Sequence, residues 1–173
     1  MKIKKANEED SKDIARVYVD SWKTTYQGLV PDSYLDNLSY EKTEQKWLDF
    51  LNSEEDPFIF VAVNDAEKII GFASGKSLDD ENFNGELYSL YLLSECRGLG
   101  IGRQLVSTIA KHFIERGIDS IIVWVMEQNE SGLGFYERIG GKEYLRKTSE
   151  FGGKIVNDVA YGWKDVSVLV MKE

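Results

Sequence analysis

A glycine-rich segment that contains two arginines is the part of the sequence best suited to chemistry. It consists of Arg97, Gly98, Leu99, Gly100, Ile101, Gly102 and Arg103. Glycine lets the backbone approach a ligand closely, and the first N–H groups of a helix have no partners within that helix. Together with the helix dipole, these groups favour a phosphate. The segment therefore predicts an anion-binding loop; a strand-to-helix turn that binds nothing is the alternative interpretation.

The kind of phosphate ligand is restricted by motifs that this segment lacks. A P-loop needs Gly-Lys-Ser or Gly-Lys-Thr, and the segment has neither. A dinucleotide-binding motif needs G-x-G-x-x-G, but its last position is Arg103 when the motif starts at Gly98 and Leu105 when it starts at Gly100. A nucleotide-binding module of the Rossmann type is therefore disfavoured. The pattern that remains is R-x-x-G-x-G.

With its surroundings, this pattern resembles the GNAT (GCN5-related N-acetyltransferase) superfamily, and in particular its bacterial members that acetylate small molecules or proteins. Glu86 to Leu93 is similar to the family's fourth strand, which precedes the motif V-x-P-x-x-R-G-x-G-x-G. Leu92 takes the place of the Val, and Ser94 stands where Pro is usual.

Two further segments carry the resemblance. Asn129 to Gly141 is similar to the family's N-x-x-A-x-x-F-Y-x-x-x-G-F, with Gly132 in place of Ala and Gly141 in place of Phe. An N-terminal run resembles the W-x-x-x-Y-x-G-x-x-P of many bacterial members; it contains Trp22, Tyr26, Gly28, Leu29 and Pro31. The similarity thus spans most of the chain.

The resemblance implies an α/β fold with a mixed, mostly antiparallel central sheet of six to seven strands flanked by helices, in a single domain over residues 1–173. It implies acetyl-CoA as the cofactor, held between two splayed parallel strands, Leu87–Leu93 and Ile121–Met126. The backbone N–H of Leu92 is the expected donor to the thioester oxygen. The expected cofactor-binding residues are Leu90, Tyr91, Leu92, Arg97, Gly98, Leu99, Gly100, Ile101, Gly102, Arg103, Asn129, Ser131 and Tyr136.

The resemblance also suggests catalytic roles. Tyr136 matches a tyrosine that protonates the departing thiolate, and a phenol with a pKa near 10 suits that task; packing beside Phe135 is the alternative. Asn129 matches a residue that binds the pantetheine arm or the CoA backbone, and it could equally cap a helix. Glu86 stands where some members place a general base, but it could be an ordinary carboxylate at a strand end. No metal site is expected.

Aromatic residues are the candidates for contact with the acceptor. Trp22, Tyr26 and Tyr88 are the expected substrate-binding residues. Trp22 and Tyr26, together with Tyr34 and Trp47, could equally be core aromatics. Two other reactive types are expected to be spectators: His112 lies mid-helix, and the thiolate of Cys96 could be favoured by the adjacent Arg97 but has no apparent histidine partner.

The function implied is direct transfer of an acetyl group from acetyl-CoA to a primary amine, either a small amine such as a polyamine or a peptide or protein amine. A non-catalytic acyl-CoA sensor or interaction protein of the same fold is the alternative. The net charge of −9 suits a cationic acceptor and disfavours nucleic acid and anionic membranes as partners. A cytoplasmic location and a homodimer are expected, the latter because dimers are common among soluble oligomers.

Hydrophobic spacing predicts the elements that position these residues. Helices are expected from Glu8 onward and over Glu41–Leu51, Gly100–Arg116 and Glu130–Ile139, with a short one after Pro31. Strands are expected over Met1–Ala6, Phe58–Val63, Ile69–Ser77, Leu87–Leu93, Ile118–Met126, Glu143–Ser149 and Asp158–Val168. Apart from one strand-helix-strand unit in the middle of the chain, the strands are expected to be mainly antiparallel.

Overall fold

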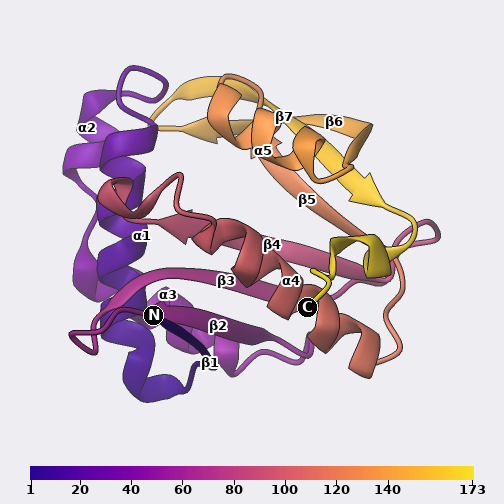
Figure 1. The fold of residues 1–173 in the computed structure, drawn as a ribbon. Helices are drawn as coiled ribbons and strands as arrows, with labels where there is room; N and C mark the ends of the chain where they lie inside the picture. Colours follow the sequence, from indigo (N-terminus) through magenta and orange to yellow (C-terminus); the bar gives the residue numbers. More distant parts are fainter.

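The computed structural model describes all residues from Met1 to Glu173 and forms one seven-stranded sheet in the order β1-β2-β3-β4-β5-β7-β6 (Figure 1). The strands are β1 (Lys2–Lys5), β2 (Phe58–Val63), β3 (Ile69–Ser77), β4 (Gly85–Leu92), β5 (Ile121–Met126), β6 (Lys142–Phe151) and β7 (Lys154–Trp163). The α-helices are α1 (Ser11–Thr25), α2 (Asp32–Asp36), α3 (Tyr40–Leu51), α4 (Ile101–Glu115) and α5 (Glu130–Arg138). This arrangement confirms the predicted mixed α/β fold.

The sheet is antiparallel except between β4 and β5, and this one parallel pair is very short. Gly85 pairs with Ile121 and Glu86 pairs with Ile122, after which the two strands separate. Figure 1 shows β5, β7 and β6 diverging from β4. Tyr88 is the extra residue of a β-bulge in β4, which increases the local twist of that strand. The gap leaves backbone groups of both strands without a partner in the sheet.

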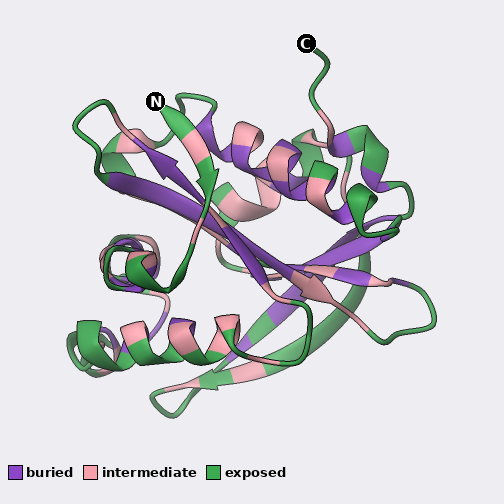
Figure 2. Cartoon of the chain, turned by 90° about the horizontal axis from the view of Figure 1, so that it is seen from below, coloured by how far each residue is buried: buried purple, intermediate pink, exposed green.

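Helices cover both faces of the sheet. On one face, α1 and α3 pack over β2 and β3 through an apolar cluster that includes Trp47, Ile59 and Phe72. On the other face, α4 packs through a second cluster that includes Leu105 and Phe113. Figure 2 shows buried positions along the strands and on the sides of the helices that face them. None of the helices combines the length and the apolar character needed to cross a lipid bilayer.

Phe113 anchors α4 to the sheet, and its loss should be costly. Its side chain is 0% exposed and lies 5.1 Å from the Phe58 ring, centroid to centroid. Phe113→Ala should therefore lower the free energy of unfolding by about 3–5 kcal/mol. Ile114→Ala is the matched control, because this neighbour on the same helix is 44% exposed. Urea denaturation should show a large fall in midpoint for the first variant and a small one for the second; equal falls would contradict this packing.

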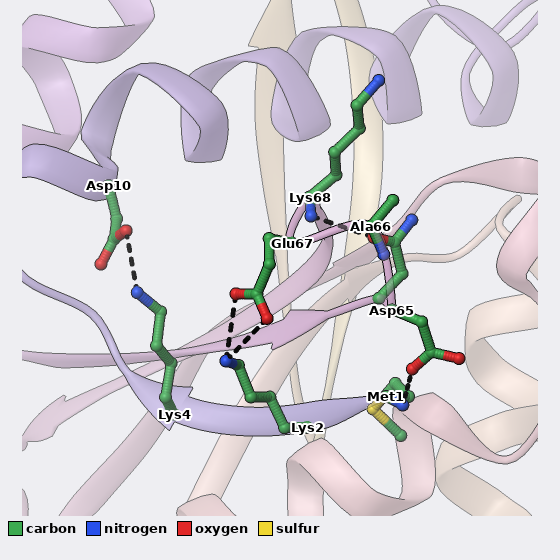
Figure 3. Close-up of polar contacts among 9 residues, drawn as sticks. Met1, Lys2, Lys4, Asp10, Asp65, Ala66, Glu67 and Lys68 are labelled. Carbon is green, nitrogen blue, oxygen red and sulfur yellow. Dashed lines mark hydrogen bonds and ion pairs between the residues drawn. The ribbon is translucent and has the colours of Figure 1, made fainter.

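Strand β1 lies at one edge of the sheet and is bordered by ion pairs (Figure 3). The terminal ammonium of Met1 lies 2.7 Å from Asp65, and Lys2 lies 3.0 Å from Glu67. Exposed pairs of this kind contribute less than about 1 kcal/mol each. The backbone ladder to β2 is therefore the main attachment of β1.

One predicted strand ends earlier than the sequence suggests. The expected strand Asp158–Val168 is wrong at its C-terminal end, because β7 stops at Trp163 and Val166–Leu169 forms a 3-10 helix. The side chain of Asp165 caps this turn by accepting a hydrogen bond from the Ser167 backbone N–H at 3.0 Å. Val166 and Leu169 are buried in the apolar cluster under α4, so their apolar character reflects packing in a turn.

Candidate active site

A cavity of about 600 Å³ lies where β4 and β5 separate. Its walls come from both strands, from the end of α1, from the glycine-rich loop before α4 and from α5. The strand residues that line it are Tyr88, Ser89, Leu90, Tyr91, Leu92, Val123, Trp124 and Val125. Since β4 and β5 no longer pair here, an elongated ligand can hydrogen-bond to their backbones between them.

One backbone donor of β4 points toward the open side of the strand. The N–H of Leu93 donates to the carbonyl of Ile70 in β3 at 3.0 Å. Successive N–H groups of a strand point in opposite directions, so the N–H of Leu92 points away from β3. This orientation agrees with the role expected for Leu92.

Left-handed glycines shape the loop at the end of the cavity. Gly98 and Gly100 have φ angles of +75° and +80°, which side chains rarely adopt, and a Cβ atom at either would meet nothing within 4 Å. Gly100 is the N-cap of α4 and has no side chain to cap it. The first N–H groups of α4 are therefore available to a ligand, and the positive end of the helix dipole lies at the cavity.

Gly102 packs against β4 and α5 behind this loop. A Cβ atom at this position would lie 3.4 Å from Leu92 Cδ1 and 3.7 Å from the Phe135 ring. The loop, β4 and α5 therefore meet closely at the first turn of α4. An uncapped helix N-terminus that faces a cavity of this size fits the pyrophosphate of acetyl-CoA.

Both arginines of the loop line the cavity, and each also has a partner in the protein. Arg97 donates to Thr25 Oγ1 at 2.7 Å, and Arg103 donates to the carbonyl of Leu169. These bonds hold the guanidinium groups beside the loop. Arg97 does not activate the adjacent thiol, because burial and Glu95 raise the pKa of Cys96. The electrostatic activation considered for Cys96 is therefore absent.

Helix α5 and its N-cap contribute Tyr136 and Asn129, respectively, to the lining of the cavity. The Tyr136 side chain is 6% exposed, and burial, assisted by the nearby Tyr26, raises the pKa of its phenol. Asn129 accepts a hydrogen bond from the Gly132 backbone N–H at 3.0 Å, which makes it the N-cap of α5. Asn129 thus has the capping role that the sequence left open and also lines the cavity. Ser131 lines it as well.

Some predicted site residues lie outside the cavity lining. Leu99 points outward and is 67% exposed, whereas Ile101 packs into the apolar cluster under α4. Trp22 is buried, and its indole N–H donates to the hydroxyl of Tyr91 at 3.1 Å, so it supports the cavity wall from behind. Glu86 lies where β4 and β5 still pair, and its carboxylate lies 3.6 Å from the Lys76 ammonium.

The aromatic residues expected at the acceptor site divide between cavity and core. Tyr26 and Tyr88 line the cavity. Trp47 is almost fully buried between α3 and the sheet, and Tyr34 packs against Trp22 and Phe151. His112 packs against the ring of Phe58 and lies outside the cavity lining.

Sequence reasoning missed several polar or aromatic residues of the lining, among them Trp124, Gln128 and Arg138. Helical spacing could have identified Arg138, because it follows Ser131 by seven positions and therefore lies on the same face of α5. Trp124 lies in an almost wholly apolar strand, so the sequence alone does not distinguish it from a core residue. Only the separation of β4 from β5 shows that Trp124 lacks a neighbour on that side of the strand.

Comparison with known proteins agrees with this geometry. The chain matches the Acetyltransferase (GNAT) family over residues 15–141. It is 38% identical over 169 residues to the uncharacterized N-acetyltransferase YuaI of Bacillus subtilis, covering 96% of this chain and 95% of that protein. It is 28% identical over 154 residues to the spermidine N(1)-acetyltransferase of Thermoplasma acidophilum, covering 87% and 94% of the two chains.

A solved structure extends the comparison to three dimensions. The PaiA N-acetyltransferase of Thermoplasma acidophilum, in complex with coenzyme A, aligns with a TM-score of 0.73 and 28% identity, covering 91% of this chain and 96% of that one. The family match spans well over half of the 173 residues and includes both β4 and the glycine-rich loop. The chain therefore belongs to the acetyltransferase (GNAT) family, whose members are acetyl-CoA-dependent N-acetyltransferases.

Proposed function

We propose that this protein transfers the acetyl group of acetyl-CoA to a primary amine, which attacks the thioester directly. The observation that carries the proposal is the cavity between β4 and β5, which has an uncapped helix N-terminus at one end and a buried tyrosine in its wall. The acetyltransfer step forms an N–C bond and breaks the C–S bond, and the thiolate takes up a proton as CoA leaves.

In this proposal the cavity provides binding and polarisation. The loop from Gly98 to Arg103 and the first turn of α4 hold the pyrophosphate, whereas Asn129 and the edges of β4 and β5 hold the pantetheine arm. The N–H of Leu92 stabilises the charge that develops on the thioester oxygen. A single backbone donor of this kind is typically worth about 10²–10³ in rate.

Tyr136 is the proposed proton donor to the thiolate. Burial raises its pKa above the ordinary value of 10.0, so the hydroxyl keeps its proton throughout the neutral and mildly alkaline range. If kcat reports the chemical step, the ratio of wild-type to Tyr136→Phe kcat should stay constant from about pH 7 to about pH 10. If the ratio instead fell toward one across that range, the Tyr136 hydroxyl would be losing its proton there. That result would contradict the raised pKa.

The acceptor amine must reach the thioester as a free base. Glu86 is the proposed proton acceptor, acting through water because it does not line the cavity directly. Burial raises the pKa of this carboxyl above its ordinary value, although Lys76 lowers it in part. A higher pKa brings a general base closer to neutral pH, where it is most effective.

A polyamine is the small acceptor that the comparisons favour, since a relative that matches over most of its length is a spermidine N(1)-acetyltransferase. The test is a panel of amines, including polyamines, amino acids and lysine-containing peptides, incubated with acetyl-CoA and monitored by CoA release. Release that depends on an amine supports the proposal. Tight binding of acetyl-CoA without release for any amine would favour a non-catalytic acyl-CoA sensor.

A further inference from the structure

An ammonium group of the protein itself lies against an aromatic residue that lines the cavity. Trp124 lines the cavity from β5, and the Lys147 Nζ lies 4.2 Å from the centroid of its ring. Lys147 comes from the neighbouring part of the sheet, on β6, and has no carboxylate within ion-pair distance. An aromatic face at this distance attracts a cation through its quadrupole. The Trp124 ring therefore already binds one cation of the protein, and no ion pair holds that cation in place.

A carboxylate and a second aromatic ring lie beside this surface. The side chain of Glu86 is 14% exposed, and the positive charge of Lys147 contributes to lowering its pKa against the effect of burial. Lys76 Nζ lies 3.6 Å from Glu86 and 5.2 Å from the centroid of the Tyr88 ring. Tyr88 is held in place by stacking on Phe50 at 5.0 Å with an interplanar angle of 9°.

Strand register places these groups at a useful distance from the reacting centre. Glu86 pairs with Ile122, so Trp124 lies at about the level of Tyr88 and Ser89. Leu92 follows three to four residues further along β4, which corresponds to roughly 10–13 Å at about 3.3 Å per residue. A flexible acceptor that carries a second ammonium can bridge that distance while its first amine attacks beside Leu92.

We propose that Trp124 and Tyr88 form a cation subsite for the second ammonium of a diamine or polyamine acceptor, and that Lys147 occupies this subsite until the acceptor displaces it. The inference rests on the proposed function, since it assigns the acceptor class of the same cavity. It goes further because it names the residues that select a second positive charge.

Binding tests the subsite without any turnover. Calorimetric titrations of the CoA-loaded protein with 1,8-diaminooctane are compared among the wild type, Trp124→Leu and Trp124→Phe. A cation on an aromatic face contributes a factor of about 3 to 30 in affinity. The Leu variant should lose about that factor and the Phe variant should recover part of it, because it retains an aromatic face. Equal affinities for the three proteins would overturn the inference whether or not acetyl transfer occurs.

Kinetics test whether Lys147 competes with the second ammonium of the acceptor, because the direction of the change in selectivity distinguishes the possibilities. The quantity measured is the ratio of kcat/KM for 1,8-diaminooctane to that for 1-aminooctane, which lacks only the second amine. The ratio should exceed one in the wild type and rise about threefold or more in Lys147→Gln, because the competing ammonium is gone. Lys154→Gln is the matched control, since it removes an exposed lysine from the same hairpin, and its ratio should equal that of the wild type.

The opposite sign would contradict the inference. A ratio that falls in Lys147→Gln would show that Lys147 does not compete with the second ammonium of the acceptor. Equal use of the two amines by the wild type would also overturn it. A different result would show that the proposed function fails while the subsite exists. In that case the diamine would bind in a Trp124-dependent way, but no amine would be acetylated.

Discussion

Replacing Gly100 by aspartate is expected to weaken acetyl-CoA binding by about 100-fold or more. Gly100 is the N-cap of α4 and adopts a φ of +80°, and a side chain there would meet open space. The new carboxylate would stand where the pyrophosphate is proposed to bind. Like charges placed against each other at a binding site cost several kcal/mol, and 1.4 kcal/mol corresponds to a factor of ten.

The control for this variant is Gly117→Asp, at the other end of the same helix. Gly117 has a φ of +75°, and a Cβ atom added there would likewise meet nothing within 4 Å. Both variants should therefore bear similar backbone strain of about 1–2 kcal/mol. Calorimetry should show lost binding for Gly100→Asp and unchanged binding for Gly117→Asp, with both proteins folded by circular dichroism. Unchanged affinity in Gly100→Asp would contradict the placement of the pyrophosphate.

Tyr136→Phe is expected to lower kcat by about 10²–10⁴ while acetyl-CoA affinity changes little. General acid catalysis typically contributes that factor, and the phenylalanine ring preserves packing against Phe135 and Trp163. The loss belongs in kcat because the proton is needed mainly in the transition state. Stopped-flow or steady-state assays of CoA release, under conditions in which chemistry limits the rate, provide the measurement.

Tyr161→Phe is the matched control for the tyrosine test. Tyr161 is also a buried tyrosine, but its hydroxyl donates to Glu137 at 2.7 Å and it does not line the cavity. Removing that hydroxyl should cost about 1 kcal/mol of stability and leave kcat near the wild-type value. Full kcat in Tyr136→Phe would leave protonation of the thiolate to water or another residue, and the acyl-transfer proposal would remain.

The glycine-rich loop and the elements on either side of it, β4 and α4, were predictable because local rules determine them. Glycines with positive φ at Gly98 and Gly100 are required by the turn, and the amphipathic spacing after Gly100 specifies α4. The N-cap at Asn129 follows from the same kind of local pattern. These features depend on residues within a few positions of each other, which a single sequence records.

The placement of Glu86, Trp22 and Trp124 depends on tertiary structure. The sequence suggests strands over both segments of the parallel pair, but it does not show that they pair at only two positions before separating. That separation decides which residues line the cavity, so Glu86 remains on the paired side and Trp124 reaches the cavity. Trp22 lies behind the cavity wall, where its indole N–H donates a hydrogen bond to the hydroxyl of Tyr91.

The central claim is acetyl transfer in the cavity between β4 and β5, and product stoichiometry tests it most directly. The protein is incubated with acetyl-CoA and its best acceptor, and free CoA thiol and acetylated amine are quantified in the same sample by mass spectrometry. The proposal predicts one acetylated amine for each CoA released, with both products lost together in Gly100→Asp. Release of CoA without acetylated amine would contradict it, because the thioester would then be hydrolysed and no amine would be the acceptor.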